Sequence, residues 1–189
     1  MIRIAVIIGS TRPGRNGEAV AKWVYEIARK RSDAEFELVD IKDFNLPLLD
    51  EPVPPSLGQY TKEHTKVWAA KIDSFDAYVF VTPEYNHGIS GALKNAIDFL
   101  FKEWNNKAAG FVSYGALGGT RAVELQPHLL DCRRPAQGRR HRAVARLLPA
   151  HRQGLPDRRG GTRLFGDAGR GGALRDIGHA GRGGRACRP

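Results

Sequence analysis

Apolar and polar positions alternate with two different periods along residues 1–124 of the chain. Short apolar or alternating runs, typical of strands in a buried parallel sheet, occupy residues 2–8, 35–40, 77–81 and 108–113. Between them, apolar residues recur at the i, i+3, i+4 and i+7 positions of amphipathic helices, at residues 18–31, 60–75 and 90–104. A fourth helix is expected to begin near residues 118–120.

The order of these elements predicts an α/β fold, with a doubly wound parallel sheet and helices on both faces. Residues 45–58 contain four prolines and are expected to form a loop. In sheets of this kind, ligands bind beyond the carboxyl ends of the strands, where the strand order reverses. Three loops leave the strands at that edge and form the candidate site: the first loop at residues 9–17, the second at 83–88 and the third at 113–119.

The first loop joins the first strand to the first helix. Its hydroxyl, guanidinium and amide side chains belong to Ser10, Thr11, Arg12, Arg15 and Asn16. A helix N-terminus adds free N–H groups and the positive end of the helix dipole, so the loop is suited to a phosphate. Its glycines fit neither the Walker A loop nor the dinucleotide fingerprint. A plain turn capped by Asn16 or Gly17 is the alternative, and the paired arginines and hydroxyls favour phosphate.

The second loop combines a proline, an aromatic ring and an amide at the end of the third strand. Pro83 restricts the backbone, Tyr85 offers a flat face, and Asn86 offers a donor and an acceptor. These groups suit the edge of a planar heterocycle. A tight turn with Asn86 and Gly88 as turn residues and Tyr85 on the surface is equally consistent with the sequence.

The third loop carries several glycines and lets a ligand approach the backbone closely. Glycine-rich loops are common, so this signal is weak when taken alone. A phosphate site, a flat-ring site and a thin backbone wall at one sheet edge together indicate a mononucleotide with a large planar ring.

Three stretches, GSTRPGRNGEAVAKW, TPEYNHGISGALKNAIDFL and VSYGALGGTRAVE, resemble the flavodoxin-like NAD(P)H-dependent FMN reductases, whose relatives are called quinone, chromate and azo reductases. The resemblance covers residues 1–124 and implies a flavodoxin-like domain of three α/β/α layers. It implies FMN phosphate binding by the first loop, with Arg15 nearby, and flavin contacts from the second and third loops. The expected cofactor-binding residues are Ser10, Thr11, Arg12, Arg15, Asn16, Gly17, Pro83, Glu84, Tyr85, Asn86, Ser113 and Gly115.

The resemblance also implies hydride transfer from NADPH or NADH to FMN, and from FMN to a quinone, azo, flavin or metal-oxyanion acceptor. The flavin performs this chemistry, so no catalytic side chain and no metal is expected. Glu84 is expected to contribute mainly backbone contacts. By the same resemblance the protein is a homo-oligomer, a dimer or a tetramer. Neither a membrane-spanning run nor a signal peptide is visible, and a cytoplasmic protein is expected.

Residues 125–189 differ in composition from the rest of the chain. They hold 15 Arg, no Lys and four acidic residues, whereas residues 1–124 are nearly neutral, so the net charge of +10 belongs to this segment. Gly, Ala, Pro and Arg make up 40 of its 65 residues, and Phe165 is its one aromatic residue. The last strand and helix of the implied fold are not clearly visible in it, and its composition indicates disorder.

Three interpretations of this segment compete: an out-of-frame translation of a GC-rich gene, an Arg/Gly-rich arm that binds nucleic acid, and a divergent lobe. The first explains the loss of Lys, Asn and Tyr as well as the charge, and it is preferred. Nucleic acid is therefore not expected as a partner. A non-enzymatic electron carrier is disfavoured, because such a carrier is expected to be strongly acidic and residues 1–124 are not.

Overall fold

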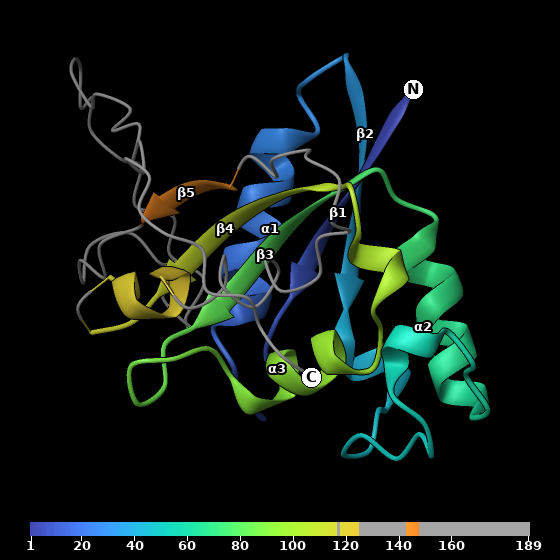
Figure 1. Ribbon diagram of the computed structural model, residues 1–189. Coiled ribbons are helices and arrows are strands. Elements are labelled where there is room, and N and C mark those ends of the chain that lie inside the picture. Colours follow the sequence, from blue (N-terminus) through green and yellow to red (C-terminus); the bar gives the residue numbers. More distant parts are fainter. Residues whose placement is uncertain (117, 125–142, 148–189) are drawn as a thin grey trace, which may run out of the picture. The chain divides into compact units, whose positions relative to one another are not determined.

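The computed structural model describes residues 1–116, 118–124 and 143–147 (Figure 1). Five parallel strands form one sheet in the order β2-β1-β3-β4-β5. The strands are β1 (Ile2–Ile8), β2 (Ala34–Asp40), β3 (Ala77–Pro83), β4 (Ala108–Tyr114) and β5 (Ala143–Leu147). This is the flavodoxin-like strand order, so the expected fold class is confirmed. The order reverses between β1 and β3, which makes their carboxyl ends the ligand-binding edge.

Strand β5 is an addition to the sequence-based prediction, which found no clear last strand. It pairs with β4 from Ala109↔Ala143 to Ser113↔Leu147. The strand has only five residues, and two alanines and an arginine among them give a weak strand signal. The sequence analysis also doubted the last helix of the fold and proposed disorder in the C-terminal segment. Both predictions concern residues outside the described part of the chain.

Three α-helices and three short 3-10 helices connect the strands. The α-helices are α1 (Gly17–Ala28), α2 (Glu63–Asp73) and α3 (Gly91–Asp98). The 3-10 helices are η1 (Ile41–Phe44), η2 (Pro55–Leu57) and η3 (Lys102–Trp104). Residues 120–124 are also helical, which confirms the expected start of a helix near Thr120. None of the helices in the described part of the chain has the length and apolar character needed to cross a membrane.

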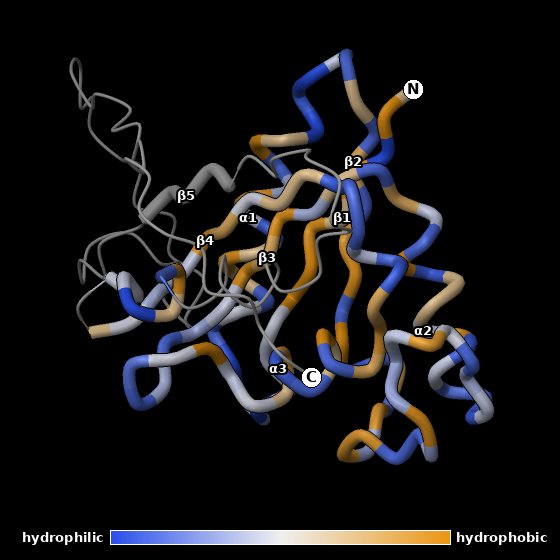
Figure 2. Tube along the Cα trace, in the orientation of Figure 1, coloured by the Kyte–Doolittle hydropathy of each residue, from blue (hydrophilic) through white to orange (hydrophobic). Residues whose placement is uncertain are grey.

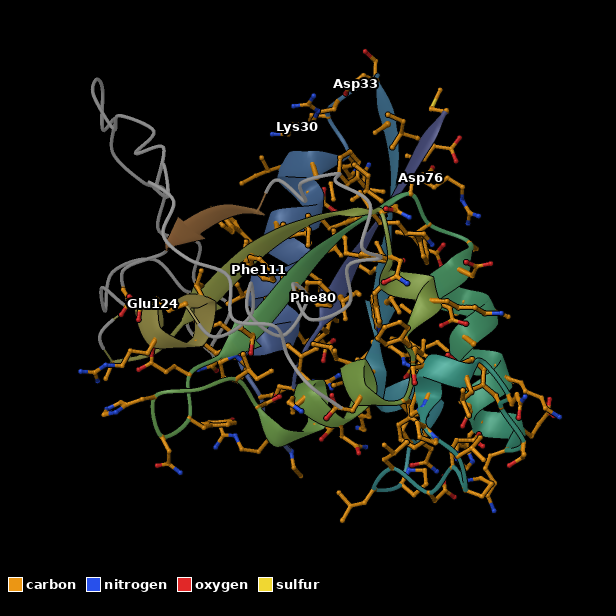
Figure 3. The ribbon with its side chains drawn as sticks, in the orientation of Figure 1. Lys30, Asp33, Asp76, Phe80, Phe111 and Glu124 are labelled. Carbon is orange, nitrogen blue, oxygen red and sulfur yellow. The ribbon has the colours of Figure 1, made fainter. Side chains whose placement is uncertain are left out.

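The alternation of side chains along β1 assigns the helices to opposite faces of the sheet. Val6 and Ile8 pack with α1, through Val20 and Ala21. Their neighbours Ala5 and Ile7 belong to the larger core cluster, which includes the buried residues of α2 and α3. Figure 2 shows the hydrophobic positions gathered along the central strands. The larger cluster is rich in aromatic rings, and Phe80 stacks on Phe111 of the neighbouring strand at 5.7 Å between centroids (Figure 3).

Helix α3 is shorter than predicted, because it ends at Asp98 and not near Trp104. Two buried indoles occupy the carbonyls that a longer helix would use: Trp68 Nε1 donates to Ala96 O at 2.8 Å, and Trp104 Nε1 donates to Ile97 O at 3.2 Å. Tertiary hydrogen bonds therefore replace the next helical turn. Apolar spacing alone does not reveal such a competition, so the prediction ran past the end of the helix.

The indole of Trp68 provides a test of this account. Trp68→Phe removes the donor to a buried carbonyl as well as part of a packed ring, and we expect the free energy of unfolding to fall by about 1–3 kcal/mol. Trp23→Phe is the matched control, since that indole is 45% exposed on α1, and it is expected to change stability by less than about 0.5 kcal/mol. Urea denaturation of both variants measures the difference. Equal losses in the two variants would contradict the capping role.

Candidate functional site

The three candidate loops meet at the carboxyl edge of the sheet, as predicted. Gly9 N donates to Val81 O at 2.8 Å, which joins the first loop to β3. Ser90, the N-cap residue of α3, donates through its hydroxyl to Gly9 O. Glu84 N donates to Tyr114 O at 3.0 Å, which joins the second loop to the end of β4. In Figure 1 the arrowheads of β1 and β3 point to this same edge.

The N-terminus of α1 has no side-chain cap. Asn16 is its N-cap residue, as the turn interpretation expected, but the Asn16 side chain makes no hydrogen bond to the helix. Thr11 and Arg12 are exposed, whereas Ser10 is buried. The first N–H groups of a helix need partners from outside its own ladder. Their position beside an exposed arginine is the electrostatic setting that favours an anion.

Tyr114 lies over the same helix end, and the sequence analysis did not single it out. A Cβ atom on Gly17 would lie 2.7 Å from Tyr114 Oη. The ring packs against the apolar cluster beneath α1. Burial raises the pKa of Tyr114 to about 12, with a further rise from Tyr85, and the charges of Arg12 and Arg15 oppose this only in part. The phenol is therefore a protonated donor at neutral pH.

Arg15, expected near the phosphate, is engaged elsewhere. Its guanidinium donates to both carboxylate oxygens of Asp40, with Nη1 3.0 Å from Oδ1, and to the carbonyl of Ser10. Asp40 is the last residue of β2, so this pair ties the first loop to the neighbouring strand. Arg12, by contrast, takes part in no ion pair recorded for the described residues.

The second loop is a two-residue hairpin turn. Tyr85 and Gly88 exchange backbone hydrogen bonds of 3.0 and 2.9 Å, and Asn86 and His87 between them have φ angles of 47° and 64°. A tight turn forms here, as one of the two interpretations expected, although His87 and not Gly88 shares the tip with Asn86. The turn is compatible with a contact to a planar heterocycle, the other interpretation. Two left-handed non-glycine residues cost about 1–3 kcal/mol each, and such strain is concentrated at ligand sites. Tyr85 is 42% exposed.

Glu84 connects the second loop to the third. Its carboxylate accepts a hydrogen bond from Arg121 N at 3.1 Å, at the start of the helical residues 120–124. A Cβ on Gly115 would lie 3.0 Å from the Glu84 Cβ, so the glycine allows the two loops to approach closely. The Glu84 side chain thus caps the N-terminus of the helical residues 120–124. Pro83 is paired with Tyr114 at the end of the sheet.

Ser113 shapes the third loop from inside. The hydroxyl is buried and donates to Gly119 O at 2.7 Å. Gly118 and Gly119 have φ angles of 78° and 74°, and a Cβ on Gly119 would lie 2.6 Å from Ser113 Oγ. The loop therefore folds over Ser113, with the backbone of Gly119 against the serine side chain.

Gly17 tests the arrangement around Tyr114. Gly17→Ala places a methyl group against the phenol oxygen, and we expect overpacking to lower the free energy of unfolding by about 1–3 kcal/mol. Adding Tyr114→Phe is expected to recover part of that loss, since the clashing oxygen is gone. Gly91→Ala is the control, because a Cβ there meets no atom within 4 Å. Urea denaturation measures all three, and equal effects at Gly17 and Gly91 would contradict the contact.

Comparison with known proteins supplies the family. The family model for NADPH-dependent FMN reductase matches residues 2–143. The NAD(P)H-dependent FMN reductase ntnL of Nectria sp is 48% identical over 128 residues, 65% of this chain and 64% of that protein. The NAD(P)H:quinone oxidoreductase of Solanum tuberosum is 35% identical over 133 residues, 68% of this chain and 66% of that protein. The chain thus spans less than two thirds of the length of these relatives.

Among solved structures, the flavoenzyme NAD(P)H:(acceptor) oxidoreductase FerB of Paracoccus denitrificans superposes with a TM-score of 0.58 at 26% identity, covering 79% of this chain and 77% of that one. This superposition supports the fold class described above. The family match extends over most of the chain and includes all three loops. The chain belongs to the NADPH-dependent FMN reductase family.

Proposed function

We propose that this chain is an FMN-dependent oxidoreductase that uses NADPH or NADH as its hydride donor. The observation that carries the proposal is the N-terminus of α1, whose N-cap side chain leaves the helix uncapped. Exposed Arg12 and the protonated phenol of Tyr114 border it. A phosphate monoester would accept hydrogen bonds from these donors. The site thus fits the phosphate end of FMN.

The residues proposed to hold FMN fall into two groups. Ser10, Thr11, Arg12, Asn16 and Gly17 would surround the phosphate, and the Tyr114 hydroxyl joins them as a donor. Residues 83–86 and the backbone at Gly115 would border the flavin ring and its ribityl chain. The chemistry that bound FMN would supply is hydride transfer from the nicotinamide and reduction of the acceptor. The protein contributes binding, orientation and a shaped backbone wall.

A quinone is the proposed acceptor class, with azo, flavin and metal-oxyanion acceptors as alternatives. The support is the name of the plant relative, an NAD(P)H:quinone oxidoreductase. Tyr85 would offer a flat, exposed surface beside the flavin for a planar acceptor. We also propose a homo-oligomer, supported by Leu48 and Leu57, which expose apolar surface at 85% and 59% in the segment between β2 and α2.

We retain the proposal that residues 125–189 are an atypical, out-of-frame segment following the FMN-binding domain at residues 1–124. The support is the abrupt gain of Arg, Gly, Ala and Pro and the loss of Lys and Tyr after Glu124. All of the expected cofactor-binding residues precede that change. The proposed FMN site therefore contains no residue of the segment, although β5 of the segment pairs with β4.

Titration of the purified chain with FMN tests the proposal, followed by anaerobic addition of NADPH. We expect one FMN bound per chain and rapid bleaching of the flavin absorbance, because the three loops are in place. Binding without bleaching would indicate an electron carrier that needs a separate reductase. No binding of FMN would contradict the proposal.

Glu84→Gln provides a sharper second arm of the same experiment. Glutamine keeps an oxygen that can accept from Arg121 N, so flavin reduction by NADPH is expected to stay within about threefold of the wild-type rate. If Glu84 served as a general base, the rate would fall by about 100-fold or more. Stopped-flow absorbance at saturating FMN distinguishes the two.

A further inference from the structure

Among the ion pairs of the described residues, the pair between Arg15 and Asp40 has the least exposed side chains. The two side chains are 9% and 17% exposed. The guanidinium uses both Nη atoms on the carboxylate, in the bidentate arrangement that makes such pairs strong. Glu18, the other carboxylate near Arg15, lies at 3.9 Å and is 48% exposed, so Asp40 is the dominant partner.

Each member of the pair also holds backbone. Arg15 Nη1 donates to Ser10 O, and Arg15 N donates to Arg12 O at 3.1 Å. The arginine thus holds the turn at residues 10–15 through both its side chain and its backbone. Asp40 Oδ1 accepts from Lys42 N at 3.0 Å and caps η1. The pair therefore fixes the first loop relative to the end of β2 as well as its internal shape.

Arg15 could either contact a bound phosphate directly or hold the loop that binds it, and these contacts favour the second role. A phosphate that drew Arg15 away would leave the Asp40 carboxylate uncompensated at a part-buried position, next to a second anion. Breaking a largely desolvated pair in this way is destabilising, because the remaining charge has lost both its partner and most of its water. Arg12 lies on the same loop, is exposed, and forms no ion pair with any of the described residues.

We propose that Arg15 and Asp40 are a positioning pair that holds the first loop in its phosphate-binding shape, while the phosphate contact itself stays with Arg12, as in the proposed function. This inference rests on the proposed function. Asp40, which lies outside all three loops, thereby becomes a determinant of FMN affinity. The preference for FMN over riboflavin, which lacks the phosphate, is the property that the pair controls.

The sign of the Asp40→Asn effect tests the proposal. A positioning pair predicts FMN binding weakened by about tenfold or more and riboflavin binding changed by less than about threefold, because the loss of loop order affects the phosphate contacts. If Asp40 instead withholds Arg15 from the phosphate, Asp40→Asn frees a cation and tightens FMN binding. Asp43→Asn is the matched control: it removes the same charge from an exposed residue of η1 and is expected to leave both affinities unchanged.

Two further variants complete the test. Arg12→Ala is expected to lower FMN affinity about tenfold or more without affecting riboflavin. Its effect should be smaller in the Asp40→Asn background, because the pair positions the loop that carries Arg12. Arg15→Lys keeps the positive charge but not the bidentate fork, so it is expected to weaken FMN binding by itself and to add little to Asp40→Asn. Fluorescence titration gives the affinities, and circular dichroism confirms that each variant is folded.

The outcomes separate the inference from the proposed function. Wild-type chain that binds FMN, together with an Asp40→Asn variant that binds it more tightly or equally well, overturns the positioning role and leaves the proposed function standing. Should Asp40→Asn not fold, an Arg15→Lys variant with unchanged FMN affinity overturns the positioning role on its own. Wild-type chain that binds no FMN overturns both.

Discussion

The close approach of the first loop to β3 is the contact on which the rest of the site depends. A Cβ on Gly9 would lie 2.8 Å from Leu93 Cδ2 and 2.9 Å from Val81 O. The leucine side chain could move, but the β3 carbonyl could not without shifting the loop or the strand. The hydrogen bonds from Gly9 N and from Ser90 Oγ hold this approach on both sides. Because β1 and β3 flank the reversal in strand order, this single junction sets where the first helix begins relative to the second loop.

Around that junction, the polar residues divide between building the loops and facing a ligand. Ser113, Glu84 and Arg15 have hydrogen-bonding partners inside the protein, and they fix the third loop, the link to the second loop and the first loop respectively. Arg12 and Tyr85 are exposed at the same edge. Some side chains that resemble ligand-binding groups in the sequence therefore hold the loops in shape. The loops then present backbone N–H groups and a smaller set of exposed side chains to a ligand.

The sequence was sufficient for the fold class, because buried parallel strands leave apolar runs that local periodicity detects. It also located the three loops, since topology brings the carboxyl ends of parallel strands together. It could not reveal partners that are distant in the chain: Asp40 for Arg15, Arg121 for Glu84, and the indoles that end α3. Tyr114 was within reach, because strand alternation places it on the same face as Val112, toward α1. Strand β5 was too short for a clear pattern.

The central claim is that three separate loops form one FMN site with the phosphate at the N-terminus of α1. Hydrogen–deuterium exchange of the full chain, with and without FMN, tests it most directly. The account predicts slower exchange on FMN binding in all three loops, residues 9–17, 83–88 and 113–119, and in the first turn of α1, while α2 is unchanged. Protection confined to another surface, or absent from the first turn of α1, would contradict it.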